Sequence, residues 1–398
     1  MKNKISQLLL LVFFIAGVFL RPDCVAQNVI SPDNSRKGSL LLFIGTFTEG
    51  ETNSKSEGIY LYEMNQNTGA LNYVTVVPAV NPAYLVVHPG KQLLYAVNEL
   101  DGKNEKYLGA VSAFRIDLKN KQLLFINKVA SCGNSPCYIS IDKTGGYVMT
   151  ANYGNGSVAI LPVGKDGSLG EAVSVIQHQG SGPNSGRQSG PHAHMITEGQ
   201  HKNIVYSADL GIDEVSIYEL DTIHGKLIPT DYNVKTKPGA GPRHLAFHPD
   251  QPWAYVVNEL NGSIEAFIID EKTGTGALSR FQTISTLPVG ETREPGSAAI
   301  HITPNGKFLY ATNRGEINNV AMFTINQKTG ELTLTGHQST LGKTPRDFVI
   351  DPTGTFVLVA NQNTSEVVTF KIDATNGKLI ETGIVTKIPN PVCLKFLE

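Results

Sequence analysis

The sequence predicts an all-β protein, a seven-bladed β-propeller with four-stranded blades whose ring is closed by pairing of the C-terminal strand with the N-terminal blade. The first observation is a motif that begins with a proline or a small residue and ends sixteen positions later with Asn. It occupies residues 82–98, 136–152, 242–258, 297–313 and 345–361, and a looser copy, two residues longer, occupies residues 191–209. The copies recur at intervals of roughly 50 residues, the repeat length of a four-stranded blade.

The second observation is the order of elements within each copy, which gives four strands per blade. Two short apolar segments flank a turn, such as His-Pro-Gly at 88–90. An alternating segment follows, such as VAMFTI at 320–325, and then a Gly-x-Leu hairpin, such as 330–332. Runs of β-branched and aromatic residues between Gly, Pro, Asn and Asp are typical of strands joined by turns. No long stretch of the mature chain has the apolar period of 3.6 residues that predicts a helix.

The two ends of the chain complete the count of blades. Residues 42–46 are similar to the second strand of a copy, and residues 58–65 and 68–71 match the strand and hairpin that follow it elsewhere. The first strand of this N-terminal blade is missing, and residues 391–396 have its pattern. Pairing of this C-terminal strand into the N-terminal blade would close the ring and remove exposed sheet edges. Seven blades result, whereas a parallel β-helix, the structural alternative, has much shorter repeats.

The composition indicates one large all-β domain over residues 39–398. The formal net charge is −2 and 17% of the residues are charged, with no Lys/Arg-rich tract. Because a basic stripe is the electrostatic footprint of nucleic-acid binding, we expect no nucleic-acid partner. No segment after residue 26 is apolar for long enough to span a bilayer, so we expect no membrane contact once a signal is removed. The sequence does not indicate an oligomeric state.

The N-terminus has the pattern of a targeting segment. Lys2 and Lys4 precede an apolar run over residues 5–20, and a Cys-Val-Ala sequence at 24–26 places small residues at the cleavage positions. We therefore expect a signal peptide over residues 1–26, cleavage after Ala26, a flexible leader over 27–38, and a periplasmic or secreted mature protein. The alternative is a lipoprotein anchored at Cys24, although the preceding Arg-Pro-Asp sequence fits poorly to that pattern.

Three cysteines remain if Cys24 is removed, an odd number that does not indicate a disulfide framework. Cys132 and Cys137 flank a Gly-Asn-Ser-Pro turn and could form a disulfide. The alternative is that Cys137 and Cys393 are buried strand residues. No cysteine spacing supports a metal site.

Residues that recur in every copy are expected to have a structural role within each blade. The candidates for catalytic or binding residues are therefore the positions where one copy differs from the others. After the initiating residue the polar departures are His192, His194, Arg243, His244, Arg346 and Asp347. After the recurrent Asn, which we expect to satisfy backbone groups, come Glu99, Tyr153, Glu259, Arg314 and Gln362. If the innermost strands begin at one mouth of the central tunnel, these side chains converge there, where a propeller can hold a small ligand.

Five short motifs occur in a fixed order: GPHAH at 190–194, DLGID at 209–213, GPRH at 241–244, NEL at 258–260 and NRG at 313–315. Together with NPAYLVVHP and LYATNRG they resemble the seven-bladed propeller lactonase family, which includes cycloisomerase-type 6-phosphogluconolactonases and a fungal carboxy-muconate cyclase. The resemblance covers nearly the whole mature chain. It implies a lactone (carboxylic-ester) hydrolase without a cofactor. The His–Arg–Glu–Arg set of the cyclase relatives falls by motif on His194, Arg243, Glu259 and Arg314.

These residue types suit the hydrolysis of a lactone. The reaction needs an activated water, stabilisation of the developing oxyanion and protonation of the ring oxygen as it leaves. We expect His194 to act as the general base or acid, because a histidine can accept or donate a proton near neutral pH. We expect Arg243 to stabilise the oxyanion or anchor the anion, Glu259 to orient His194 or Arg243, and Arg314 to bind the acidic group.

The expected substrate is a small anionic lactone, since the planar guanidinium of Arg matches a carboxylate or a phosphate. The expected substrate-binding residues are His192, His244, Arg346, Arg187, Gln188, Glu99 and Tyr153. Because phosphorylated gluconolactone is a cytosolic metabolite, export leaves an unphosphorylated aldonolactone as an alternative substrate.

Other functions remain open at this point. A muconate-type cycloisomerase or a metal-dependent lactonase could use the same scaffold, the latter with Glu99, Asn152, Asp209, Glu259 and Asn361 as oxygen donors to Ca²⁺. The arginines and histidines of the same mouth would repel such a cation, so we expect no metal. A non-catalytic binding propeller is the third class. No Gly-x-Ser-x-Gly elbow and no phosphate-binding nucleotide loop occurs.

Overall fold

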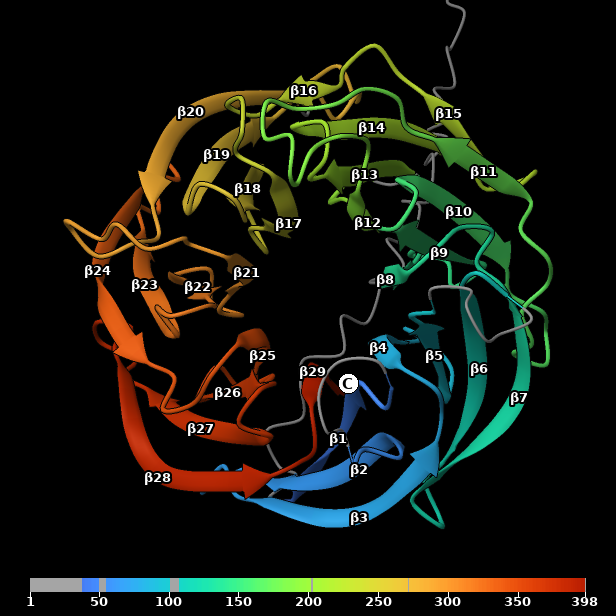
Figure 1. Ribbon diagram of the computed structural model, residues 1–398. Helices are drawn as coiled ribbons and strands as arrows, with labels where there is room; N and C mark the ends of the chain where they lie inside the picture. Colours follow the sequence, from blue (N-terminus) through green and yellow to red (C-terminus); the bar gives the residue numbers. More distant parts are fainter. Residues whose placement is uncertain (1–37, 50–54, 101–106, 202, 271, 398) are drawn as a thin grey trace, which may run out of the picture. The chain divides into compact units, whose positions relative to one another are not determined.

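Seven antiparallel sheets are arranged around a common axis, with the chain running from one sheet to the next in sequence order (Figure 1). The computed structural model describes residues 38–49, 55–100, 107–201, 203–270 and 272–397, and these residues form 29 strands and no helix. The predicted all-β class and the seven blades are therefore confirmed. The predicted signal peptide, its cleavage site, Cys24 and the leader up to residue 37 lie outside the described residues.

Each sheet has an innermost strand, two middle strands and an outer strand, and in the fourth sheet the outer position is divided between two short strands that both pair with the third. The first blade contains β29 (Pro391–Phe396), β1 (Ser39–Thr46), β2 (Gly58–Asn65) and β3 (Leu71–Pro78). The second contains β4 (Pro82–Val87), β5 (Leu93–Asn98), β6 (Ala110–Asp117) and β7 (Gln122–Ala130), and the third β8 (Pro136–Ile141), β9 (Tyr147–Asn152), β10 (Ser157–Pro162) and β11 (Ser174–Gln177). The fourth contains β12 (Ala193–Glu198), β13 (Ile204–Asp209), β14 (Glu214–Asp221), β15 (Lys226–Pro229) and the short β16 (Val234–Lys235).

The remaining three blades repeat the four-stranded plan. The fifth contains β17 (Pro242–Phe247), β18 (Trp253–Asn258), β19 (Ser263–Ile269) and β20 (Leu278–Ser285). The sixth contains β21 (Ser297–Ile302), β22 (Phe308–Asn313), β23 (Asn319–Ile325) and β24 (Leu332–Ser339). The seventh contains β25 (Pro345–Ile350), β26 (Phe356–Asn361), β27 (Glu366–Ile372) and β28 (Leu379–Lys387).

The C-terminal strand closes the ring as predicted. Strand β29 pairs with β1 in an antiparallel register that places Ile44 opposite Leu394. It thereby becomes the innermost strand of the N-terminal blade, next to β4 and β25 in Figure 1. Because β29 fills this position, the two ends of the described chain are joined by a ladder of backbone hydrogen bonds rather than left as free sheet edges.

A repeated tyrosine explains why the Gly-x-Leu hairpin recurs. The second strands of four blades each carry a buried tyrosine whose hydroxyl donates to the carbonyl of a hairpin glycine in the following blade. The pairs are Tyr95 with Gly167, Tyr206 with Gly276, Tyr255 with Gly330 and Tyr310 with Gly377, at 2.7–3.2 Å. All four glycines have φ between 69° and 90°, a conformation that other residues adopt only with strain. The hairpins therefore fasten neighbouring blades together.

The innermost strands begin with a register shift, which re-aims the side chains at one end of the axis. In the fifth blade, Pro242 pairs with Asn258 and His244 pairs with Val257, so Arg243 is the extra residue of a β-bulge. Equivalent shifts occur at the start of the other innermost strands. Bulges are common where a sheet positions functional side chains, and here every blade has one at the same level.

The register corrects one alignment made from the sequence. The looser copy does not begin at Pro191, because Ala193 is the residue that pairs with Asp209. Residues 193–209 therefore have the same length as the other copies, with Ala in place of the initial Pro and Asp in place of the final Asn. As a consequence, His194 is the bulge residue equivalent to Arg243, and His192 lies before the strand.

Four of the five recurrent Asn residues satisfy backbone carbonyls, as expected, whereas the amide of Asn258 donates to the hydroxyl of Ser263. The side-chain amides of Asn98, Asn152, Asn313 and Asn361 donate to Val80, Ser131, Thr286 and Thr340, respectively. Each acceptor belongs to the segment that leads into an innermost strand, so these bonds hold the start of that strand against the end of the second strand. The part of the chain that the structure describes contains no helix of the length and apolarity needed to cross a membrane.

Candidate active site

Polar side chains from several blades meet at the end of the axis where the innermost strands begin. Glu259, which follows β18 in the fifth blade, contacts Arg314, which follows β22 in the sixth. It also contacts Arg187, from the long connection between β11 and β12. Arg346 of the seventh blade reaches Glu99 of the second. Several of the residues that depart from the repeats are therefore joined by contacts between segments far apart in the sequence.

Glu259 is the centre of this arrangement. Its Oε2 lies 2.8 Å from Nη2 of Arg314 and 3.1 Å from Nε of Arg243, and its Oε1 accepts a hydrogen bond of 2.7 Å from Nη2 of Arg187. Glu259 is 5% exposed and Arg243 is 2% exposed. Arg187 thus donates a hydrogen bond to this carboxylate, whereas Arg243 contacts it as an ion pair in which the buried Nε has no hydrogen-bond partner among the described residues. The carboxylate therefore has three cationic partners, which favour its ionised form.

The charges of this cluster shift the pKa values of its members. Burial alone would favour the neutral acid, but Arg314 and Arg243 hold the pKa of Glu259 far below its usual range. Burial, with Arg314 nearby, lowers the pKa of Arg243 to about 9. Arg243 therefore keeps its charge at neutral pH, as arginine does in nearly all proteins. The four arginines of this cluster (Arg187, Arg243, Arg314 and Arg346) outnumber the two carboxylates of Glu259 and Glu99, which leaves an excess of two positive charges.

His194 lies beside this cluster at the same level as Arg243. Burial, with Arg243 nearby, holds the pKa of His194 well below its usual range, so the imidazole is neutral at pH 7. Its Nδ1 lies 3.6 Å from Sγ of Cys137. His194 is 5% exposed. A neutral imidazole can accept a proton.

His244 lies beside His194, one residue further along its strand than Arg243. Its ring is edge-on to the ring of His194, with centroids 5.2 Å apart, and edge-on to the ring of Tyr138. Nη1 of Arg243 lies 3.4 Å from its Nε2. Burial, with Arg243 nearby, lowers the pKa of His244 well below its usual range. His244 therefore adds a neutral polar group and a support for Arg243.

Arg346 and Glu99 form a second, looser polar group at the mouth. Nη2 of Arg346 is 3.7 Å from Oε2 of Glu99, beyond hydrogen-bonding distance. The guanidinium also lies over the ring of Phe47, 5.0 Å from its centroid. Because the carboxylate partner of Arg346 is distant, few interactions are lost when its N–H donors turn toward a bound anion. The same reorientation of Arg243 or Arg314 would break a closer ion pair with Glu259.

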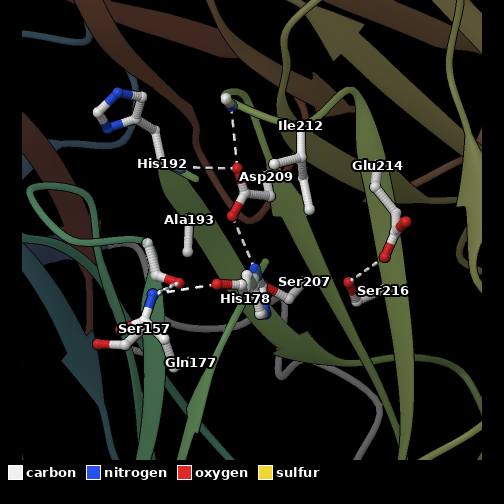
Figure 2. Close-up of polar contacts among 12 residues, drawn as sticks. Ser157, Gln177, His178, His192, Ala193, Ser207, Asp209, Ile212, Glu214 and Ser216 are labelled. Atoms are coloured by element: carbon white, nitrogen blue, oxygen red, sulfur yellow. Dashed lines mark hydrogen bonds and ion pairs between the residues drawn. The ribbon is translucent and has the colours of Figure 1, made fainter. Parts of the chain in front are cut away.

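His192 and Tyr153 form one wall of the site. Their rings are stacked with centroids 4.6 Å apart, and Nδ1 of His192 lies 2.8 Å from the carbonyl oxygen of Tyr153. The backbone N–H of His192 donates to Oδ1 of Asp209, while the imidazole points away from that carboxylate (Figure 2). The Tyr153 hydroxyl accepts a hydrogen bond of 3.3 Å from Arg187. These contacts link His192, Tyr153 and Arg187 as neighbours.

The structure adds His178, which the sequence analysis did not single out. Its Nδ1 is 2.7 Å from Oδ2 of Asp209 (Figure 2). Its Nε2 is 2.7 Å from the hydroxyl of Tyr218, and all three residues are buried. His178 stands just after β11, where the long connection toward His192 begins. It therefore fastens the base of the segment that carries Arg187. No repeat position marks it, because this connection has no counterpart in the other blades.

Gln188 does not face the mouth, in contrast to its predicted contact with substrate. It is fully buried, and its amide Nε2 donates to the carbonyl of Leu210 and to Oδ1 of Asp213. Asp213 also accepts from the backbone N–H groups of Gly239 and Gly241, next to Arg243. These two residues connect the loop that carries Arg187 with the start of β17, so Gln188 is placed as an anchor of that loop.

The structure also shows the surroundings of the cysteines and of the residues considered as ligands of Ca²⁺. Cys132, Cys137 and Cys393 are all free, so the disulfide considered for Cys132 and Cys137 is absent. No group of three or more His, Cys, Asp or Glu side chains in the described ranges is arranged to hold a metal ion. Of the oxygen donors considered for Ca²⁺, Asn152 and Asn361 donate their amides to backbone carbonyls, and Glu259 is neutralised by arginines.

Comparison with known proteins shows the family of this chain. Residues 41–396 match the family model "Lactonase, 7-bladed beta-propeller". A 6-phosphogluconolactonase of Bacillus subtilis (strain 168) is 37% identical over 357 residues, which cover 89% of this chain and 98% of the relative. A 6-phosphogluconolactonase of Formosa agariphila is 32% identical, covering 85% of this chain and 94% of the relative. The solved structure of a periplasmic gluconolactonase of Pseudomonas aeruginosa has a TM-score of 0.85 and 33% identity, covering 91% of this chain and 99% of that one.

Proposed function

Because the chain belongs to the seven-bladed β-propeller lactonase family, we propose that it is a lactone hydrolase of the 6-phosphogluconolactonase type that opens sugar-acid lactones at the mouth described above. The observation that carries the proposal is the triple contact of Glu259 with Arg187, Arg243 and Arg314 beside the neutral His194. The relatives named 6-phosphogluconolactonase and the periplasmic gluconolactonase support the same reaction type.

In the proposed reaction His194 acts as the general base. Nε2 of His194 takes a proton from a water molecule as the water oxygen attacks the lactone carbonyl, and the carbonyl oxygen becomes an oxyanion. The fixed guanidinium of Arg243 stabilises that charge, and it needs no reorganisation because Glu259 already holds it. The bond between the carbonyl carbon and the ring oxygen then breaks. The protonated His194 returns its proton to the ring oxygen, and the products are a hydroxyl group and a carboxylic acid that ionises.

The remaining polar groups of the mouth bind and orient the substrate. Arg314 is fixed by Glu259 and by a hydrogen bond of its Nε to the carbonyl of Gly296, so it offers a rigid contact for an acidic group. Arg346 offers a more adaptable one. His192, His244, Glu99 and Tyr153 contribute donors and acceptors for the hydroxyl groups of a sugar acid, and Arg187 covers the site from its loop. The excess of positive charge favours a substrate that is already an anion.

The chemistry of the mouth accepts two related substrates, a phosphorylated and a plain δ-lactone. The relatives are named for both the phosphorylated and the unphosphorylated compound. If the predicted signal peptide is removed on export, the mature protein is periplasmic or secreted and meets the plain aldonolactone. In that setting Arg346 binds the hydroxyl groups or the carboxylate product in place of a phosphate.

Titration of acid release tests the proposal directly. The mature protein is incubated in a pH-stat with 6-phosphoglucono-δ-lactone and with glucono-δ-lactone, with and without EDTA, and the spontaneous rate is subtracted. We expect saturable acid release from at least one lactone, unchanged by the chelator. Rates equal to the spontaneous ones for both lactones would contradict the proposed hydrolase, and loss of turnover with EDTA would support the metal-dependent alternative.

A further inference from the structure

Cys137 stands at the bulge of β8, in the blade next to the one that carries His194. Its Sγ lies 3.6 Å from Nδ1 of His194, 3.6 Å from the carbonyl oxygen of His194 and 3.8 Å from the carbonyl oxygen of Ala193. Cys137 is 5% exposed. The thiol is thus enclosed between one ring nitrogen and two backbone acceptors.

The protonation state of the thiol follows from its surroundings. Burial raises the pKa of Cys137 above its usual range, so the sulfur keeps its proton at neutral pH. A protonated thiol has one weak donor and a sulfur atom that can accept. It can therefore make one hydrogen bond as a donor and another as an acceptor at the same time.

The two tautomers of His194 differ in how many of these bonds they allow. If Nδ1 carries the proton, Nδ1–H donates to the sulfur while S–H donates to a carbonyl of β12, and two bonds form. If Nε2 carries the proton, S–H donates to Nδ1, only one bond forms, and the carbonyls receive nothing from the thiol. Because buried polar groups favour the arrangement that satisfies more of them, the surroundings favour the proton on Nδ1.

We propose that Cys137 is a positioning residue that holds His194 in the tautomer protonated at Nδ1, so that the lone pair of Nε2 faces the substrate water. The proposal rests on the proposed lactone hydrolysis, in which Nε2 of His194 accepts the proton of that water. Cys137 touches no reacting atom and acts only through the ring of His194.

The equivalent positions in other blades support a particular role for this cysteine. Where the innermost strand has a bulge, the equivalent residues include Ala83, Ala298 and Val392, which have no polar side-chain atom. A blade therefore does not need a thiol at this position. Cys137 is the member of this set whose neighbour in the next blade is a histidine.

The test replaces Cys137 with alanine and reads out both turnover and tautomer. In Cys137→Ala we expect kcat to fall by about three- to tenfold with KM unchanged, the range that one neutral hydrogen bond contributes. Nitrogen-15 NMR of histidine-labelled protein should show His194 moving from protonation at Nδ1 toward a mixture with protonation at Nε2. The His194 signals are assigned from their loss in His194→Gln. Cys137→Ser, with a shorter arm to the same hydrogen-bonding partners, should lie between wild type and Cys137→Ala.

The matched control is Cys393→Ala, another buried thiol of an innermost strand, whose charged neighbours are Lys395 and Asp347. It should reduce thermal stability as Cys137→Ala does, without changing the tautomer of His194 or kcat. An unchanged tautomer in Cys137→Ala, or a wild-type His194 protonated at Nε2, would overturn the inference even if the enzyme is active. A wild-type protein that is inactive toward lactones would instead contradict the proposed function, and the NMR result would still decide the role of Cys137.

Discussion

The carboxylate of Glu259 lies 3.1 Å from Nε of Arg243, and both side chains are almost completely buried where the innermost strands begin. This ion pair fixes the guanidinium that we assign to the developing oxyanion. Isolated buried charges are costly, so each member depends on the other to remain in place. Neutralising Glu259 should therefore affect both the stability of the protein and its turnover.

Replacing Glu259 with Gln leaves three arginines without their shared carboxylate. Because Arg243 cannot move to solvent, the free energy of unfolding should fall by roughly 3–5 kcal/mol, the usual cost of breaking a buried ion pair. Denaturant unfolding measures this loss, and kcat/KM should fall as well. Glu63→Gln, which removes the partly exposed partner of the exposed Lys121, is the matched control and should cost much less. Equal losses for the two variants would contradict a special role of Glu259.

Replacing His194 with Gln removes the proposed general base and keeps a polar side chain of similar size. General base catalysis contributes about 10²–10⁴-fold, so kcat should fall within that range while the fold is retained. His224→Gln is the control, because the side chain of His224 is 68% exposed on a hairpin, where it pairs with Asp221. Full activity in His194→Gln would remove this residue from the mechanism.

The pH dependence follows from the direction of the histidine shift. Burial and Arg243, together with Arg346, lower the pKa of His194, and Glu259 opposes them only in part. The imidazole therefore stays neutral below its usual range near pH 6.5, and kcat/KM should remain level as the pH falls through that value. A decline with a midpoint near 6.5 would show that the catalytic base is an ordinary exposed histidine.

The same shift predicts how stability changes with pH. Below about pH 6.5 the unfolded chain binds a proton at His194 and at His244 that the folded protein does not bind, so the free energy of unfolding falls as the pH falls. Thermal melts between pH 7 and pH 5 should show this loss. The variant His194→Gln should lose less stability over the same interval than the wild type does.

Replacement of Arg346 should distinguish between the two candidate substrates. If its loosely held guanidinium binds a phosphate, Arg346→Ala should raise KM for 6-phosphoglucono-δ-lactone by about tenfold or more, the loss expected for a charge-assisted hydrogen bond. The effect on KM for glucono-δ-lactone should be much smaller. Arg115→Ala, an exposed arginine on β6, is the control. Equal effects on both lactones would place the phosphate elsewhere.

The repeats were sufficient to predict the blades and the ring closure, and they bring several of the predicted site residues into contact. The spacing between Pro82 and Asn98 marks two hydrogen-bonded strands, and a polar departure such as Arg243 stands out against alanine at the same position. The fourth copy was misaligned because Ala193 and Asp209 replace the residues that mark its ends, while Pro191 stands two residues too early. Periodicity alone could not show that His194 and Arg243 are equivalent.

The supporting contacts could not be predicted from the repeat. His178, Gln188 and Asp213 belong to segments that occur once in the sequence. No equivalent position in another blade is therefore available for comparison. The convergence of Arg187 on Glu259 depends on how a connection of irregular structure folds back over the mouth, which no pattern of strands encodes. Gln188 was expected to meet substrate because it neighbours Arg187, but alternate residues of a loop commonly point in opposite directions, and its amide is buried.

The most direct test of the central claim compares acid release from δ-lactones by the wild type and by Arg243→Gln in the same pH-stat. Our account predicts saturable hydrolysis by the wild type and a fall of about 10²–10³-fold in kcat for Arg243→Gln, the usual effect of removing one oxyanion donor. Wild-type hydrolysis that Arg243→Gln leaves unchanged would contradict the assignment of the reaction to the mouth that Glu259 organises.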